Sequence, residues 1–184
     1  MRNSTVGLVC GAAMLALAAS LAWAEKSKSP AVGTAAPDFT AYDYVTGSKT
    51  RLSDQHGKVV ILTFWATWCS PCRQELPNLE GIQEKLGKDQ LVVLAVNFQD
   101  SDDTISYLKK SAKKAAWKIS MLLDTNGSIA GKYGIDSIPH LFLIGRDGNI
   151  AAAHSGFGDG SLDEMLPEIN AALAGKPAPA TAAE

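Results

Sequence analysis

The segment VVILTFWATWCSPCRQELP, residues 59–77, decides the fold, because an apolar run leads directly into two cysteines that are separated by two residues. The run at 59–66 is continuous, β-branched and aromatic, which is typical of a central strand covered on both faces. After the cysteines, apolar residues recur at spacings of three, three and four, as on one face of a helix: Leu76, Leu79, Ile82 and Leu86. The sequence therefore predicts a strand, a cysteine pair at its end and a helix that ends at Gly87.

Outward from this unit, apolar runs and helical patterns alternate along the chain. The further predicted elements are a strand at 91–98, a helix at 102–117, a short strand at 119–124, a short helix at 127–135, strands at 140–145 and 150–157, and a helix at 161–173. Asp147-Gly148 indicates a hairpin turn, and Ser161 followed by Glu164 matches a capping box with Ser161 as the N-cap. This order predicts an α/β fold with a mixed central sheet and helices on both faces.

The first 24 residues differ from the rest of the chain. Arg2 precedes a long apolar run, and Ala22-Trp23-Ala24 has the small-x-small pattern of a cleavage site, which together are typical of a secretory signal peptide. An uncleaved N-terminal membrane anchor at residues 6–24 is the alternative, because the apolar stretch is just long enough to span a bilayer. In both cases we expect the body of the protein in the periplasm or another extracytoplasmic location.

One domain is expected between two polar ends. Residues 25–36 are small, polar and contain Pro and Gly, which predicts a flexible tether. Residues 175–184 have the same character and are predicted to be a disordered tail, which leaves 37–174 as the folded domain.

Composition argues against nucleic-acid binding and against a domain that is stabilised by several disulfides. The chain has 17 Lys and Arg against 19 Asp and Glu, a formal net charge of −2, so it lacks the basic excess that nucleic-acid binding requires. Cys10 lies within the leader, so only Cys69 and Cys72 remain in the body. A domain held together by disulfides would need several cysteines along its length.

The cysteine pair has three interpretations. A structural zinc site needs four ligands, but no second cysteine pair follows and the histidines are scattered at His56, His140 and His154. A static disulfide across two residues would close too small a loop to restrict the unfolded chain much. Redox or soft-metal chemistry is favoured, because a cysteine at a helix N-terminus meets free N–H groups and the positive end of the helix dipole, which stabilise a thiolate. Pro71 fits the first turn of such a helix.

The motifs resemble those of thioredoxin, and more closely those of its exported TlpA/ResA-like branch. Besides the Trp-Cys-x-Pro-Cys sequence, the matching pieces are APDF at 36–39, the stretch 52–77, YGIDSIPHLFLIGRDG at 133–148 and an extra segment near 101–124. The resemblance implies a thioredoxin fold with extra N-terminal strands and a central helix–strand insertion. It also implies that residues 37–174 form a thioredoxin-like domain.

The resemblance implies a role for each residue around the dithiol. Cys69 would be the exposed nucleophile and Cys72 the resolving thiol of a redox-active disulfide. Pro139 would be a cis-proline beside them, and Ile138 would offer its backbone to an incoming peptide. Trp68 would flank the thiols and bind substrate, or else be a partly buried anchor.

Two further residues are candidates, each with an alternative. Glu75 matches an acidic residue of this branch, and a partly buried carboxylate there would raise a thiol pKa and accept its proton; the alternative is an exposed glutamate in the first helical turn. Ordinary thioredoxin has a buried Asp where this chain has Thr63, so proton transfer would fall to Glu75 or water. His140 would lower a thiol pKa, bind substrate or ligate a soft metal, or it is a strand-end residue. His56 and His154 are expected to be structural.

The expected function is that of an exported thiol-disulfide oxidoreductase that reduces protein disulfides, with no cofactor and no resident metal. The resemblance implies a membrane thiol-electron carrier as the reductant, and apocytochrome c or copper-site proteins of respiratory oxidases as targets. Two alternatives stay open. One is an oxidant or isomerase that donates its disulfide, and the other is a copper(I) chaperone that uses Cys69 and Cys72, with His140 as a candidate third ligand.

Overall fold

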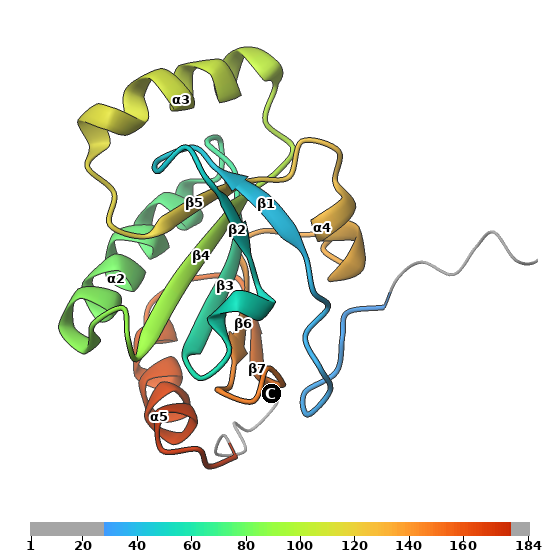
Figure 1. Cartoon of the computed structure of the whole chain (residues 1–184), viewed down its shortest axis with the longest axis vertical. Helices are drawn as coiled ribbons and strands as arrows, with labels where there is room; N and C mark the ends of the chain where they lie inside the picture. Colours follow the sequence, from blue (N-terminus) through green and yellow to red (C-terminus); the bar gives the residue numbers. More distant parts are fainter. Residues whose placement is uncertain (1–27, 178–184) are drawn as a thin grey trace, which may run out of the picture.

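The computed structural model describes residues 28–177, which contain seven strands and the helices that cover them (Figure 1). The elements are β1 (Thr40–Asp43), β2 (Lys49–Arg51), the 3-10 helix η2 (Ser53–Gln55), β3 (Val59–Trp65), α2 (Ser70–Leu86), β4 (Leu91–Asn97), α3 (Asp102–Ala115), β5 (Ser120–Leu123), α4 (Ser128–Lys132), β6 (His140–Ile144), β7 (Ile150–Ser155) and α5 (Ser161–Leu173).

The strands form one mixed sheet in the order β2-β1-β5-β4-β3-β6-β7. The three central strands β5, β4 and β3 are parallel, while β6 and β7 on one side and β1 and β2 on the other are antiparallel additions. The carboxyl ends of the parallel strands therefore meet at one edge of the sheet, which we call the dithiol edge because Cys69 follows β3 there. The extra N-terminal strands and the central helix–strand segment are both present as β1, β2, α3 and β5.

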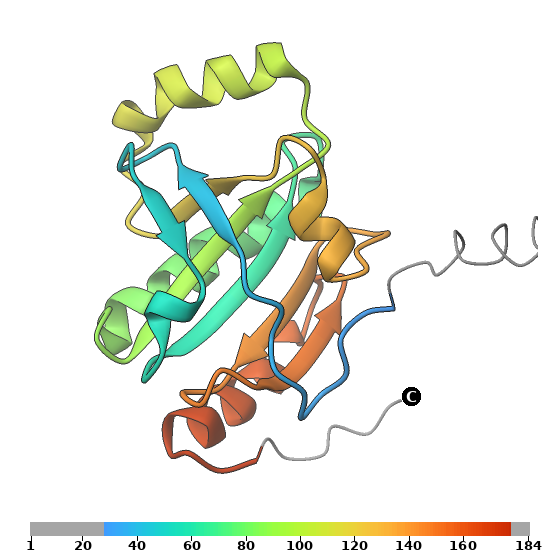
Figure 2. The ribbon, with the colours of Figure 1, turned by 45° about the vertical axis from the view of Figure 1, so that its right-hand side comes forward.

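Helices cover both faces of the sheet, as predicted (Figure 2). One apolar cluster contains Ile61 and Trp65 of β3, both cysteines of the dithiol, and side chains of α2 and α5; we call its side the first face. The other cluster contains Leu62 and Phe64 with residues of α4, and we call its side the second face. Residue alternation along β3 places Thr63 on the first face, beneath α2. Burial of these two apolar layers is the main favourable contribution to folding.

The start of α5 corrects one prediction. Gly160, not Ser161, is the N-cap, with φ of 88° and no side-chain cap hydrogen bond. The Ser161 hydroxyl instead accepts a hydrogen bond from the N–H of Gly158, at 2.9 Å. The chain enters α5 through a left-handed turn that glycine adopts without a steric penalty, so the predicted capping box is wrong.

The predicted tether is wrong for its last residues. The N–H of Gly33 donates to the carbonyl of Ile150 at 2.8 Å, Ile150 donates back to Thr34 at 2.9 Å, and Ala36 donates to Gly148 at 3.0 Å. This segment therefore lies along the turn between β6 and β7 (Figure 2). A polar composition did not exclude pairing, because backbone groups and not side chains make these contacts.

The C-terminal boundary also differs from the prediction. Gly175 and Lys176 donate to the carbonyls of Ala172 and Ala171, at 3.1 and 2.9 Å, and so close the last turn of α5. The predicted leader and most of the predicted tail lie outside the described residues. Within 28–177, no helix combines the length and apolarity that are needed to cross a bilayer.

Candidate active site at the dithiol edge

Cys69 and Cys72 form a disulfide at the start of α2. Cys69 is the N-cap of this helix, and its sulfur accepts a hydrogen bond from the N–H of Cys72 at 3.2 Å. Pro71 lies in the first turn, where its missing N–H leaves no helical hydrogen bond unmade. After reduction, the same N–H and the helix dipole would favour the thiolate form of Cys69.

The two sulfurs differ little in exposure in this oxidised form. Cys69 is 4% exposed and Cys72 is fully buried, so the exposure expected of the nucleophile is slight. The neighbouring Trp68, in contrast, is 59% exposed. The alternative of a partly buried anchor at Trp68 is therefore wrong, and its indole offers an apolar surface beside the disulfide.

Pro139 lies at the same edge of the sheet. The Ile138–Pro139 peptide bond is cis, and the carbonyl of Pro139 accepts a hydrogen bond from Gly156 at 2.8 Å. The next residue, His140, pairs with Phe64 near the end of β3, just before the cysteines. The cis-proline and the dithiol thus come together from segments that are far apart in the sequence.

Glu75 is a buried carboxylate on the same helix as the dithiol. It is 1% exposed, and the hydroxyl of Thr63 donates to its Oε2 at 2.7 Å. Burial raises the pKa of Glu75 to about 7, and the hydrogen bond from Thr63 offsets only part of that increase. The alternative of an exposed first-turn glutamate is therefore wrong. Three residues after Cys72 and on the same side of α2, this group can exchange a proton near neutral pH.

His140 does not join the residues on the first face. Its ring stacks on Phe142 with centroids 4.9 Å apart, and its Nδ1 lies 3.1 Å from the hydroxyl of Ser155. Strand alternation places it with Phe64 and Phe142 on the second face, opposite Thr63. Burial lowers the pKa of His140, which disfavours a positive charge on its ring.

The structure also gives no third ligand for a metal at the dithiol. In the described part of the chain, no three side chains of His, Cys, Asp or Glu lie close enough together to hold a metal ion. Of the predicted copper(I) ligands, the described residues therefore bring Cys69 and Cys72 together without His140 as a third.

One functional feature that the sequence analysis missed is a network around Thr67, two residues before Cys69. Asp100 accepts hydrogen bonds from the Thr67 N–H and hydroxyl, at 2.9 and 2.8 Å, and from the Asn97 side-chain amide at 2.7 Å. Arg73 donates to the carbonyl of Thr67 at 2.7 Å. Every polar group of Thr67 is thus bound, which holds the segment that leads into the disulfide against the end of β4.

A second missed feature is the partner of His154, which was expected to be merely structural. Its Nε2 lies 2.6 Å from Oε2 of Glu168, a residue of α5 that is 1% exposed. The only available signal was Glu168 itself, because this glutamate interrupts the apolar stripe that Met165, Ile169 and Ala172 form on α5.

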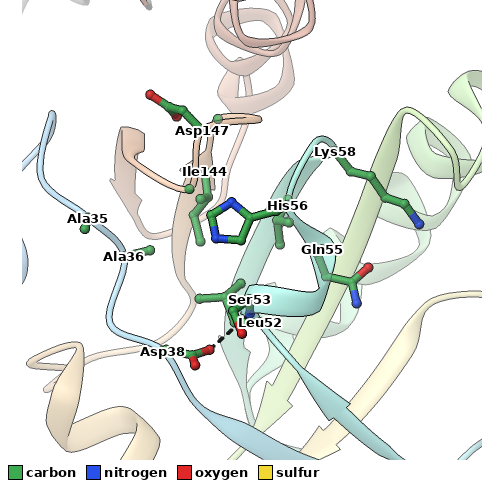
Figure 3. Close-up of a pocket in the computed structure, with 13 residues that line it drawn as sticks. Ala35, Ala36, Asp38, Leu52, Ser53, Gln55, His56, Lys58, Ile144 and Asp147 are labelled. Carbon is green, nitrogen blue, oxygen red and sulfur yellow. Dashed lines mark hydrogen bonds between the residues drawn. The ribbon is translucent and has the colours of Figure 1, made fainter.

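A separate hollow of about 120 Å³ lies at the other end of β3 (Figure 3). His56 points toward it (Figure 3), Ser53 and Asp147 also line it, and it is bordered by Val60 and Ile144, which are remote from the dithiol edge. His56 packs over Gly148, where an added Cβ would lie 2.7 Å from its Cε1. This hollow therefore takes no part in the dithiol chemistry, and the contact is structural.

Comparison with known proteins places this geometry among thiol-disulfide enzymes. The model of the AhpC/TSA family matches residues 32–153. The thioredoxin-like protein YneN of Bacillus subtilis (strain 168) is 37% identical over 124 residues, which cover 67% of this chain and 71% of that protein. The thiol-disulfide oxidoreductase ResA of Bacillus anthracis is 34% identical over 128 residues, covering 70% of this chain and 71% of ResA.

Solved structures agree with these relatives. A candidate thiol:disulfide interchange protein DsbE from Chlorobium tepidum superposes with a TM-score of 0.69 at 34% identity, covering 79% of this chain and 99% of that one. The exposed lipoprotein thioredoxin Etrx1 from Streptococcus pneumoniae strain TIGR4 has a TM-score of 0.61 at 33% identity, covering 73% and 98%. The implied thioredoxin fold is thereby confirmed.

Proposed function

Since the chain belongs to the AhpC/TSA family and is a thiol-disulfide oxidoreductase of thioredoxin fold, we propose that it reduces disulfides of other proteins outside the cytoplasm. The proposal depends above all on Glu75, a buried carboxylate with a pKa of about 7 close behind the dithiol. A carboxylate there disfavours a thiolate on Cys72 and so gives the reduced pair little stabilisation. Oxidants of this fold are strong because their reduced form is stabilised, so the Glu75 environment favours a reductant.

The catalytic cycle uses two thiols and moves two electrons. The Cys69 thiolate attacks one sulfur of the substrate disulfide, forms a mixed disulfide and releases the first substrate thiolate. Cys72 then loses its proton to Glu75 or to water and attacks the Cys69 sulfur, which releases the second substrate thiolate and leaves the disulfide seen here. The two released thiolates take up two protons.

Residues around the disulfide would receive the substrate during this cycle. The exposed Trp68 would contact the substrate next to its disulfide, and the backbone of Ile138 would pair with it as a short added strand. Pro139 would hold the peptide against Cys69. The same chemistry run backwards would donate a disulfide, so the direction depends on the reduction potential.

The proposed compartment and partners follow from the leader and from the relatives. An exported reductant in an oxidising compartment needs electrons from a membrane thiol carrier. Apocytochrome c and copper-site proteins are the proposed substrates, because both need reduced cysteines before they bind haem or metal. The signal peptide or anchor predicted at residues 1–24 supports this proposal, as does the similarity to an exposed lipoprotein.

The test is the equilibrium reduction potential of the dithiol in residues 25–184, measured against glutathione buffers. We expect a value near or below about −270 mV, the potential of thioredoxin. A value near about −120 mV would make the protein an oxidant and reverse the proposed direction of electron flow.

A further inference from the structure

A cavity of about 380 Å³ opens at the dithiol edge, between the segment that follows β4 and the start of α4. Its lining includes Asn97 and Asp100 from the end of β4, Asp124 and Thr125 after β5, and the apolar side chains Ile105 and Ile135. In open α/β sheets, ligands bind at the carboxyl ends of parallel strands, which is where this cavity lies. No step of the catalytic cycle above uses it.

The cavity is close to the two segments that would contact the substrate disulfide, one before Cys69 and one before Pro139. Asp100 in its wall binds Thr67, which precedes Cys69 by two residues, or at most about 7.6 Å along the chain. Ile135, also in the wall, precedes Pro139 by four residues. An extended peptide advances about 3.3–3.6 Å per residue, so a side chain two to four residues from the substrate cysteine would reach the cavity.

Hydrogen-bond acceptors outnumber donors in the wall. Asn97 is 1% exposed, its amide nitrogen donates to Asp100, and its Oδ1 has no hydrogen-bond partner among the described residues. Asp124 accepts one hydrogen bond at each oxygen, from the N–H groups of Ile129 and Ala130, and so keeps acceptor capacity. Among the described residues that line the cavity, none is basic.

We propose that this cavity binds a lysine or arginine side chain of the substrate protein, near its target cysteine. The proposal rests on the proposed function and names a determinant of its substrate specificity. A cationic group would supply the donor that Asn97 Oδ1 lacks and a positive charge beside the carboxylates of Asp100 and Asp124, and charge-assisted hydrogen bonds are the strong ones. The side chains of Ile105 and Ile135 would cover the methylene groups of the same side chain.

The experiment compares matched peptides as substrates of the reduced full chain. Each peptide has one cysteine, blocked as a mixed disulfide with β-mercaptoethanol, and places Arg, norleucine or Glu at one of roughly four positions on either side of it. The second-order rate constant for peptide release is followed by chromatography. We expect Arg at one position to react about tenfold faster than norleucine there, and Glu to react more slowly than norleucine.

Two variants separate the cavity from the general charge of the surface. Thr125→Lys places a lysine from an exposed position into the cavity, whereas Asn126→Lys adds the same charge one residue away, outside the lining. Thr125→Lys should abolish the preference for Arg and Asn126→Lys should keep it. Both should reduce the small, neutral bis(2-hydroxyethyl) disulfide at the wild-type rate.

The outcomes distinguish this proposal from the one on which it rests. Equal rates for all peptides, or a preference for Arg that survives Thr125→Lys, would overturn the cavity proposal alone. A wild-type chain that reduces no disulfide at all, including the small neutral one, would contradict the proposed function, and the cavity proposal would fail with it.

Discussion

Two glutamates are buried on the first face of the same sheet, and only one of them has a partner that can carry a positive charge. Thr63, Leu141 and His154 form one cross-strand row on that face. Glu75 of α2 binds the hydroxyl at one end of the row, at 2.7 Å, and Glu168 of α5 binds the imidazole at the other end, at 2.6 Å. Both are 1% exposed.

The difference between the partners explains how two similar carboxylates serve different purposes. A hydroxyl donates a hydrogen bond but cannot compensate a charge, so burial keeps the pKa of Glu75 at about 7. The imidazole of His154 lies 2.6 Å from the Glu168 carboxylate, and this contact fastens α5 to β7. The molecule thus has one glutamate placed for proton exchange and one placed for structure.

The largest expected effect comes from removing the imidazole partner of Glu168. His154→Leu leaves Glu168 buried without a compensating group, and we expect the free energy of unfolding at pH 7 to fall by roughly 3 kcal/mol or more. Urea denaturation of the oxidised protein measures this. The double variant His154→Leu/Glu168→Met should recover most of the loss, because replacing both partners removes the unpaired charge. An equally unstable double variant would mean that the pair is not the cause.

The second effect concerns Glu75, where a substitution should raise the free energy of unfolding at neutral pH instead of lowering it. The pKa of Glu75 is raised in the folded state, from 4.5 to about 7, so the folded protein binds its proton more tightly than the unfolded chain does. The contribution of Glu75 to the free energy of unfolding is therefore most favourable below about pH 4.5, and it becomes less favourable by about 3 kcal/mol in total as the pH rises through 7. Glu75→Gln should remove this loss and make the oxidised protein more stable at pH 8.

Activity should change in the other direction in the same variant. Glu75→Gln cannot accept the Cys72 proton, so we expect resolution of the mixed disulfide to slow about a hundredfold at pH 7. Rapid-mixing kinetics of a trapped mixed disulfide would measure that step. A variant that is as fast as wild type, or whose stability still falls between pH 5 and 8, would contradict the role of Glu75.

A third change removes the Thr63 hydroxyl, the uncharged partner of Glu75. Thr63→Val deletes the hydroxyl that lowers the pKa of Glu75, so that pKa should rise by about one, equivalent to about 1.4 kcal/mol. The pH at which the resolution rate is half-maximal should move upward by the same amount. Titration of Glu75 by NMR in the oxidised protein measures the change directly, and Thr63→Ser, which keeps the hydroxyl, is the matched control.

Local signals explain which parts of this structure could be predicted. Each correct prediction depended on a pattern that lies within a single element. These patterns are the apolar runs of β3 and β4, the helical period of α2 and the glycine at its end, Gly87. The position of the dithiol follows from the same stretch. The pairing of residues 33–36 was missed because their partners lie at the turn between β6 and β7, far along the chain.

The missed residues of the site share one physical reason. His154 and Glu168 meet only because α5 packs across β7, and Asp100 reaches Thr67 only because β3 and β4 are neighbours in the sheet. Each residue alone has an ordinary sequence context. The effect on the thiols that was predicted for His140 is not supported by its position, since strand alternation with Phe142 places its side chain on the face opposite Thr63, and its role in substrate binding stays a prediction.

The smallest expected effect tests whether His140 acts on the dithiol. It is adjacent in the sequence to the cis-proline, which lies at the dithiol edge, but its ring lies on the second face of the sheet. His140 follows the cis-proline directly, yet its ring stacks on Phe142 on the second face and burial lowers its pKa. His140→Gln should therefore lower the free energy of unfolding by only about 1 kcal/mol, through the lost stacking on Phe142. The reduction potential should stay within about 10 mV of wild type, because no charge near the dithiol changes. A change of about 60 mV would show that the imidazole acts on the thiols across the sheet, and distance in the sequence would then be the better guide.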